Sequence, residues 1–90
     1  MKLNGHTGRV RCLTILQNGN LASGSDDKTV IIWSTKDWKH LQVLKGHTFW
    51  VYSILEVPSK NVLLTGSRDE TVKLWDKQNY KDLGTIQNNG

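Results

Sequence analysis

The chain has 90 residues, which is the length of one small domain. Its 12 basic and 8 acidic residues leave a net charge of +4. The lysines are scattered, so no basic stripe predicts nucleic-acid binding. One cysteine excludes an intramolecular disulfide framework and fits a reducing compartment. The N-terminus lacks a signal-peptide pattern, and no apolar run approaches the roughly 18 residues of a membrane span. We therefore expect an intracellular protein, cytoplasmic or nuclear, with no membrane partner.

The first half of the chain consists of short apolar segments with β-branched residues, separated by turn signals. Asn18-Gly19 is a strong hairpin signal between the first two segments. The third segment is apolar nearly throughout, which predicts burial on both faces. The fourth alternates apolar and polar residues, as an edge strand does. Four strands are predicted, at residues 10–16 (VRCLTIL), 21–24 (LASG), 29–33 (TVIIW) and 40–44 (HLQVL).

The second half of the chain has the same order of segments. Pro58 marks the turn after its first strand. The predicted strands are 51–57 (VYSILEV), 62–66 (VLLTG), 71–75 (TVKLW) and 82–86 (DLGTI). Helical periodicity is absent throughout. The fold class predicted from these patterns is all-β, with two four-stranded antiparallel meanders.

A tandem repeat explains this duplication. The segment GSDDKTVIIWS at 24–34 recurs as GSRDETVKLWD at 66–76, so that six residue types repeat at an offset of 42. Gly-His-Thr at 5–7 also recurs, at 46–48 with an offset of 41. Self-similarity at a fixed period of this length is the signature of a repeat architecture.

These residues resemble the WD40 family, in which a Gly-His pair, a GS-x-D turn and a Trp closing the third strand recur at this spacing. The resemblance implies two propeller blades, at residues 1–44 and 45–90. About 4 to 8 such blades normally close a ring. Two blades leave two apolar faces uncovered. We therefore expect a segment of a larger propeller or, as the alternative, several copies that complete one propeller together.

One constellation could be mistaken for a hydrolase site. His6, Ser23 and Asp27 are the residue types of a catalytic triad. The set occurs twice, however, with Thr replacing Ser in the second copy, and no nucleophile-elbow motif is present. The WD40 resemblance implies a structural hydrogen-bond network instead, and we predict no enzymatic activity. The eight network residues are His6, Ser23, Asp27, Trp33, His47, Thr65, Asp69 and Trp75.

The resemblance also indicates where a partner would bind. The positions flank the valine after each Gly-His pair and precede each turn aspartate; they are Arg9, Arg11 and Asp26, then Trp50, Tyr52 and Arg68. All three arginines of the chain fall in this set. Arg, Trp and Tyr are enriched at interface hot spots, and the Arg fork matches a carboxylate or a phosphate.

Three function classes remain, and the third, nucleic-acid binding through the basic residues, ranks behind the other two because the lysines are scattered. The leading one is a non-enzymatic scaffold that binds a protein or an acidic or phosphorylated peptide through these six residues. The alternative is an architectural blade pair that associates with itself and has no separate ligand. Neither class requires a metal or a cofactor, since the sequence shows no zinc-ligand spacing and no phosphate-cradling glycine loop.

Overall fold

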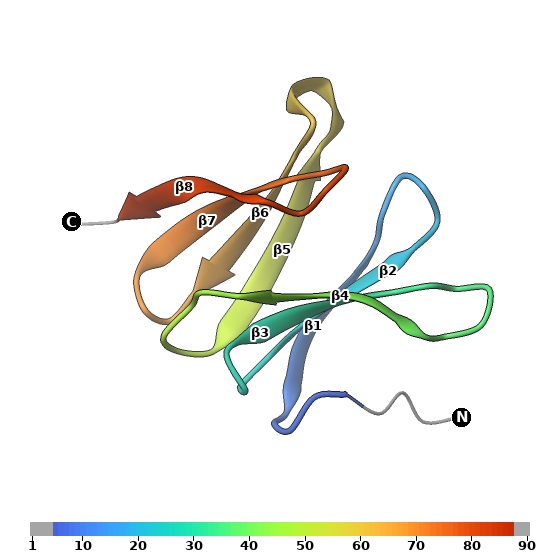
Figure 1. The fold of residues 1–90 in the computed structure, drawn as a ribbon. Coiled ribbons are helices and arrows are strands. Elements are labelled where there is room, and N and C mark those ends of the chain that lie inside the picture. Colours follow the sequence, from blue (N-terminus) through green and yellow to red (C-terminus); the bar gives the residue numbers. More distant parts are fainter. Residues whose placement is uncertain (1–4, 88–90) are drawn as a thin grey trace.

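A computed structural model of the protein describes residues 5–87. The chain forms two antiparallel four-stranded sheets, with strand orders β1-β2-β3-β4 and β5-β6-β7-β8. The sheets lie side by side, and β5 contacts β1 and β2 (Figure 1). The elements are β1 (Val10–Ile15), β2 (Leu21–Ser25), β3 (Thr29–Trp33), β4 (His40–Lys45), β5 (Val51–Val57), η1 (Pro58–Lys60), β6 (Val62–Ser67), β7 (Thr71–Asp76) and β8 (Asp82–Gln87).

All eight predicted strands are present, and each boundary lies within one residue of its prediction. The all-β class is confirmed. The turn expected at Pro58 is one turn of 3₁₀ helix, which Asn61 closes in a left-handed conformation. The first and last residues of the two predicted blades, 1–4 and 88–90, lie outside the described residues.

The hairpin at Asn18-Gly19 has a three-residue loop. The Leu16 N–H donates to the Asn20 carbonyl at 2.7 Å, and the Gly19 N–H donates to the Leu16 carbonyl at 2.9 Å. Gly19 has a φ of 93°, a region that a side chain disfavours. The residue pattern therefore predicted the hairpin. Its loop has three residues, one more than the shortest hairpin loops, and Gly19 takes the left-handed position in it.

The core lies between the two sheets. From the first sheet it includes Ala22, Val30, Ile32 and Leu44, and from the second Val51, Leu63 and Trp75. As predicted, β3 is buried on both faces: Ile32 faces the second sheet and is 0% exposed, and Ile31, on the other face, is 1% exposed. Burying apolar area is the main favourable term in folding, so the contact between the sheets stabilises both of them.

A polar bridge joins the sheets at the end where β1 turns into β2. The Glu56 carboxylate accepts from the Gln17 backbone N–H at 2.7 Å and pairs with the Lys77 ammonium at 2.9 Å. The Lys77 ammonium also donates to the Gln17 side-chain oxygen at 3.0 Å. Glu56 and Lys77 belong to the second sheet, whereas Gln17 belongs to the first. The bridge therefore connects the two sheets by polar contacts in addition to the apolar core.

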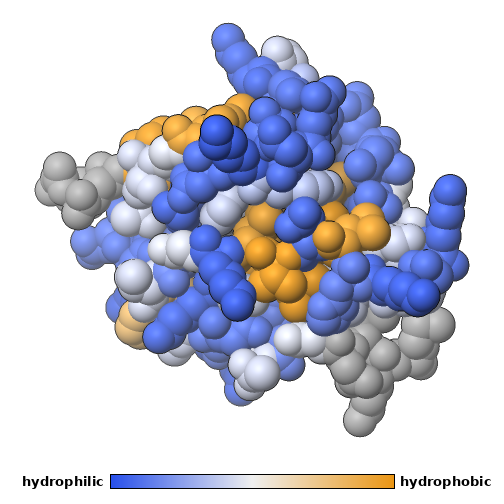
Figure 2. Space-filling model, viewed as in Figure 1, coloured by the Kyte–Doolittle hydropathy of each residue, from blue (hydrophilic) through white to orange (hydrophobic). Residues whose placement is uncertain are grey.

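The second sheet has an uncovered apolar face. Leu64, Val72, Leu74 and Ile86 stand at the positions that Ala22, Val30, Ile32 and Leu44 hold in the first sheet. The first-sheet set is at most 4% exposed, whereas Ile86 is 58% exposed. Hydrophobic surface also lies beside β8, on the side away from β1–β4, and near the middle of the view where the sheets adjoin (Figure 2).

Truncating the core between the sheets should destabilise the chain strongly. Leu63 is fully buried, so Leu63→Ala removes apolar contacts and leaves a cavity. We expect a loss of about 2–5 kcal/mol in the free energy of unfolding, measured by urea denaturation. Leu41→Ala is the control, because Leu41 is 48% exposed, and its loss should stay within about 0.5 kcal/mol. Equal losses in the two variants would contradict this assignment of the core.

Candidate functional site

The first hydrogen-bond network connects the loop before β1 with β2, β3 and the turn between them. His6 Nδ1 donates to the Asp27 carboxylate at 2.8 Å. His6 Nε2 lies 2.7 Å from Ser23 Oγ, which also accepts from the Trp33 indole N–H at 2.8 Å. Because the carboxylate only accepts, a neutral imidazole donates to it through Nδ1 and accepts the serine proton at Nε2. Every polar group in this series therefore has a partner.

The second sheet repeats the network with a threonine. His47 Nδ1 donates to the Asp69 carboxylate at 3.1 Å, and His47 Nε2 lies 2.7 Å from Thr65 Oγ1. The Trp75 indole donates to the same hydroxyl at 2.9 Å. The structure thus brings together all eight residues that the sequence assigned to networks, as two sets of four.

The central hydroxyls are closed to solvent. Ser23 is 2% exposed and Thr65 is 0% exposed. Each hydroxyl is held between an indole and an imidazole, so neither lies where a substrate carbonyl could reach it. The arrangement orients loops and strands, and it lacks the access that nucleophilic catalysis needs.

The turn aspartates accept more hydrogen bonds than the histidines supply. Burial by itself would raise the pKa of Asp27, but hydrogen bonds from Thr29, His6 and the Thr7 backbone outweigh it and lower the pKa to about 2. Asp69 has the same environment, and its pKa is also held below the usual range. Hydrogen bonds to a carboxylate favour its charged form, so both aspartates remain ionised as they brace their turns.

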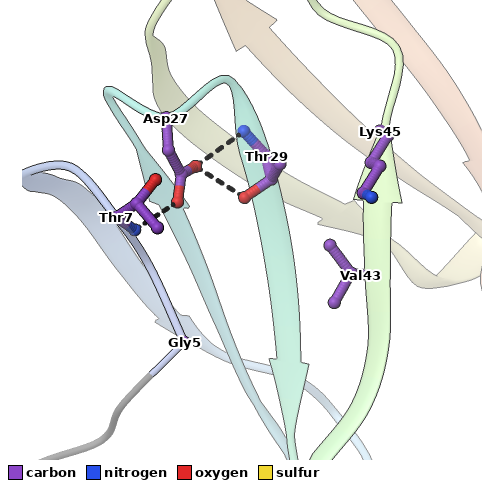
Figure 3. A pocket seen from close by; sticks show the side chains of 6 residues that line it. All are labelled: Gly5, Thr7, Asp27, Thr29, Val43 and Lys45. Atoms are coloured by element: carbon purple, nitrogen blue, oxygen red, sulfur yellow. Dashed lines mark hydrogen bonds between the residues drawn. The ribbon is translucent and has the colours of Figure 1, made fainter.

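A shallow pocket opens on the face of the first sheet that points away from the second. Its volume is about 350 Å³, and Figure 3 shows its lining residues: Gly5, Thr7, Asp27, Thr29, Val43 and Lys45. On the equivalent face of the second sheet, Lys73 stands at the position that Ile31 holds in the first sheet, and its ammonium donates to Thr85 at 2.9 Å. Asp27 already accepts from its own loop and strand, so the pocket offers little unused polar chemistry.

The six residues of the predicted partner-binding set lie at the same end of the two sheets; we call them the loop-end surface. β-Bulges place two of them. The pairing shifts between Val10 and Cys12, which leaves Arg11 as the extra residue. It shifts between Val51 and Ser53 as well, which leaves Tyr52 as the extra residue. Bulges re-aim side chains, and no sequence signal marked either of these.

The backbone holds the other members of the loop-end surface beside the bulges. The Asp26 N–H donates to the Arg9 carbonyl at 2.8 Å. In the second sheet, the Arg68 N–H donates to the Trp50 carbonyl at 2.9 Å. Each turn between the second and third strands is therefore joined to the segment that enters the first strand.

Arg11 connects the two sheets within the loop-end surface. Its Nε and Nη2 donate to the two Asp26 oxygens at 2.5 and 3.1 Å. Its guanidinium carbon lies 4.4 Å from the centre of the Trp50 ring, which is a cation–π contact. The hydrogen bonds with Asp26 raise the pKa of Arg11. The sequence analysis placed Arg11 in the partner-binding set, but the Nε and Nη2 edge of its guanidinium is already bound to Asp26.

Arg9 and Arg68 remain exposed, and neither side chain makes a hydrogen bond or an ion pair within residues 5–87. Trp50 is 38% exposed and Tyr52 is 53% exposed. Phe49, which sequence reasoning missed, is 42% exposed and packs against Trp50 with ring centres 5.1 Å apart. The sequence feature that could have identified Phe49 is the Phe-Trp dipeptide directly before a strand. The surface thus combines two uncommitted arginines with three exposed aromatic rings.

Metal and membrane sites can be assessed for residues 5–87 alone. Within that range no three His, Cys, Asp or Glu side chains gather so that they could hold a metal ion. The same part of the chain contains no helix with the length and apolar character needed to cross a membrane.

Comparison with known proteins identifies the family. The profile "WD domain, G-beta repeat" matches residues 1–34 and 38–76. The chain belongs to the WD40 family. Over 59 residues this WD40 chain is 40% identical to a guanine nucleotide-binding protein subunit beta of Schizosaccharomyces pombe. Over 66 residues it is 41% identical to the human WD repeat and SOCS box-containing protein 1. These alignments cover 66% and 70% of the chain.

Solved WD40 structures share the fold. The crystal structure of RRP9 WD40 repeats superposes with a TM-score of 0.88 over 96% of the chain, at 24% identity. The chain spans 19% and 16% of the two sequence relatives and 28% of the RRP9 chain. The two sheets are therefore two WD40 propeller blades, and the relatives contain further sequence outside the matched part.

The network should make stability depend on pH. The folded pKa of Asp27 is about 2, below the ordinary value of about 3.9, so the unfolded chain binds more protons between these values. Stability contributed by this carboxylate is therefore present above about pH 5 and is lost as the pH falls toward 2. In urea denaturation, the stability difference between wild type and Asp27→Asn should be largest at neutral pH and shrink at low pH. A difference that stays constant from pH 7 to pH 2 would contradict this role.

Proposed function

We propose that this WD40 chain is a non-enzymatic protein-interaction module that binds an acidic or phosphorylated peptide through its loop-end surface. The observation that carries the proposal is that Arg9 and Arg68 are exposed at the same end of the two sheets as the exposed rings of Trp50 and Tyr52. WD40 proteins generally bind other proteins, which supports a peptide or protein partner. The lack of a basic stripe disfavours nucleic acid.

The chemistry of these side chains matches an anionic ligand. An unpaired arginine offers a planar fork that can donate two parallel hydrogen bonds to a carboxylate or a phosphate. Exposed aromatic rings supply contact area for the neighbouring peptide at a low entropy cost. The surface therefore combines a charged anchor with an apolar platform, the composition of an interface hot spot.

We also propose that the chain has no catalytic activity of its own and acts inside the cell. The buried hydroxyls of the two networks support the first inference. The single half-buried cysteine supports the second, since extracellular domains of this size commonly rely on disulfides.

Reversing the charge of Arg68 should abolish most peptide binding. We expect Arg68→Glu to weaken binding of a short phosphothreonine peptide at least about tenfold, because a hydrogen-bonded charge is lost and a like charge replaces it. Isothermal titration calorimetry measures the change. Lys60→Glu is the matched control: it makes the same charge change in the β5–β6 turn, at the opposite end of the sheet. Full retention of binding in Arg68→Glu would contradict the proposed function.

The uncovered apolar faces favour a second candidate, in which the blade pair associates with itself to complete a propeller. Leu64, Val72, Leu74 and Ile86 present on β6–β8 the surface that the first blade buries. On the far face of the first blade, Leu13 is 63% exposed and Ile15 is 64% exposed. Head-to-tail contact between these faces would cover both, and such heterologous contacts close rings.

Size-exclusion chromatography with light scattering tests this second candidate. It requires a discrete complex of three or four copies, which make the six or eight blades of a closed ring. Leu74→Lys should dissociate that complex, because a charge is buried without a partner. Leu41→Lys, on the outer strand β4, should leave it intact. A wild-type chain that stays monomeric as its concentration rises would contradict self-association.

A further inference from the structure

The two blades differ at all three equivalent positions of the loop-end surface, and two of these positions matter here: the bulged residue and the residue before the turn aspartate. In the first blade the bulged residue is Arg11, and the residue before the turn aspartate is Asp26. In the second blade these positions hold Tyr52 and Arg68. The first pair is an ion pair, whereas Arg68 has no carboxylate opposite it. At these two positions the arginine is therefore ion-paired in the first blade, whereas in the second blade it has no ion-pair partner within residues 5–87.

Asp26 occupies one of the two edges through which the Arg11 guanidinium can bind an anionic ligand. Nε and Nη2 form one side of the guanidinium fork, and both donate to the Asp26 carboxylate, at 2.5 and 3.1 Å. A phosphate or a carboxylate from a ligand would form the same two parallel bonds. The ion pair is partly open to solvent, with side-chain exposures of 30% for Arg11 and 22% for Asp26. A competing anion can therefore reach it.

Trp50 keeps the Arg11 guanidinium in place independently of Asp26. The ring supports one face of the guanidinium at 4.4 Å, while Asp26 binds its edge. The Trp50 backbone is held by the hydrogen bond from the Arg68 N–H to its carbonyl, and its ring packs against Phe49. Loss of the carboxylate would leave the fork oriented toward solvent, so a ligand would not have to order it.

Asp26 can release Arg11 without disturbing the fold. Within the described residues its carboxylate hydrogen-bonds to Arg11 alone, and its backbone N–H remains bound to the Arg9 carbonyl. The adjacent Asp27 is different, because its carboxylate accepts from His6, Thr7 and Thr29. The turn is thus held by Asp27, and the Asp26 side chain is free to rotate.

We propose that Asp26 is an internal competitor that occupies Arg11 until a phosphorylated peptide displaces it. This inference rests on the proposed function and assigns its ligand class. A phosphoryl group carries roughly −1.5 to −2 charges near neutral pH, more than the single charge of Asp26, and so it can take the guanidinium fork from the carboxylate. Arg68, which has no internal competitor, makes the first contact, and Arg11 adds to it when Asp26 moves away.

The test removes the competitor and measures binding by calorimetry. The probes are three short peptides of otherwise identical Gly and Ser composition that carry phosphothreonine, glutamate or threonine. We expect Asp26→Asn to bind the phosphothreonine peptide about tenfold more tightly than wild type does. Asp37→Asn makes the same charge change in the β3–β4 turn, at the opposite end of the sheet, and should bind as wild type does. In Arg11→Met with Asp26→Asn the gain should disappear, because no fork is released.

The outcomes separate this inference from the proposed function. If wild type binds the phosphothreonine peptide but Asp26→Asn shows no gain, Asp26 is not a competitor and the proposed function stands. A gain that also appears in Asp37→Asn, or that survives the loss of Arg11, overturns the inference as well. A gain confined to the glutamate peptide overturns the assigned ligand class. If neither wild type nor Asp26→Asn binds any probe, both proposals fail.

Discussion

Burial of one apolar sheet face against the next is the constraint on which this structure depends. Ala22, Val30, Ile32 and Leu44 leave water only because the second blade covers them. The repeat puts apolar residues at the same positions of the second blade, where no third sheet follows within residues 5–87, and Ile86 is 58% exposed. A repeat architecture gains stability from each interface between neighbouring units, and within residues 5–87 one such interface adds to the stability of the two blades themselves.

The buried hydrogen-bond networks have a different task. They tie each loop to the turn between the second and third strands, through His6 and Asp27 in one blade and His47 and Asp69 in the other. Because these carboxylates remain ionised and fully bonded, the turns that carry Asp26 and Arg68 are held firmly. Architecture and the proposed recognition therefore use adjacent residues: one aspartate fixes each turn, and the residue before it belongs to the loop-end surface.

The loop-end surface combines exposed aromatic rings with one ion-paired arginine and two unpaired arginines. The Arg11–Asp26 pair joins the blades through Trp50, and the exposed Arg9 and Arg68 add positive charge at the same end of the sheets. Since an arginine paired with a carboxylate contributes less to attracting an anion than an unpaired one, the number of arginines alone overstates the anion-binding capacity of this surface.

The sequence by itself determined the eight strands, the hairpin at Asn18-Gly19, the two blades and the residue types of both networks. These follow from local patterns, namely alternation, turn residues and a repeat at a fixed offset, and the structure shows each strand within one residue of its expected place. The bulges that expose Arg11 and Tyr52, the pairing of Arg11 with Asp26 and the contact with Trp50 were decided only by the tertiary structure. They depend on strand register and on how the two blades approach each other. Residues far apart in the sequence meet there, and no local sequence pattern specifies which of them come into contact.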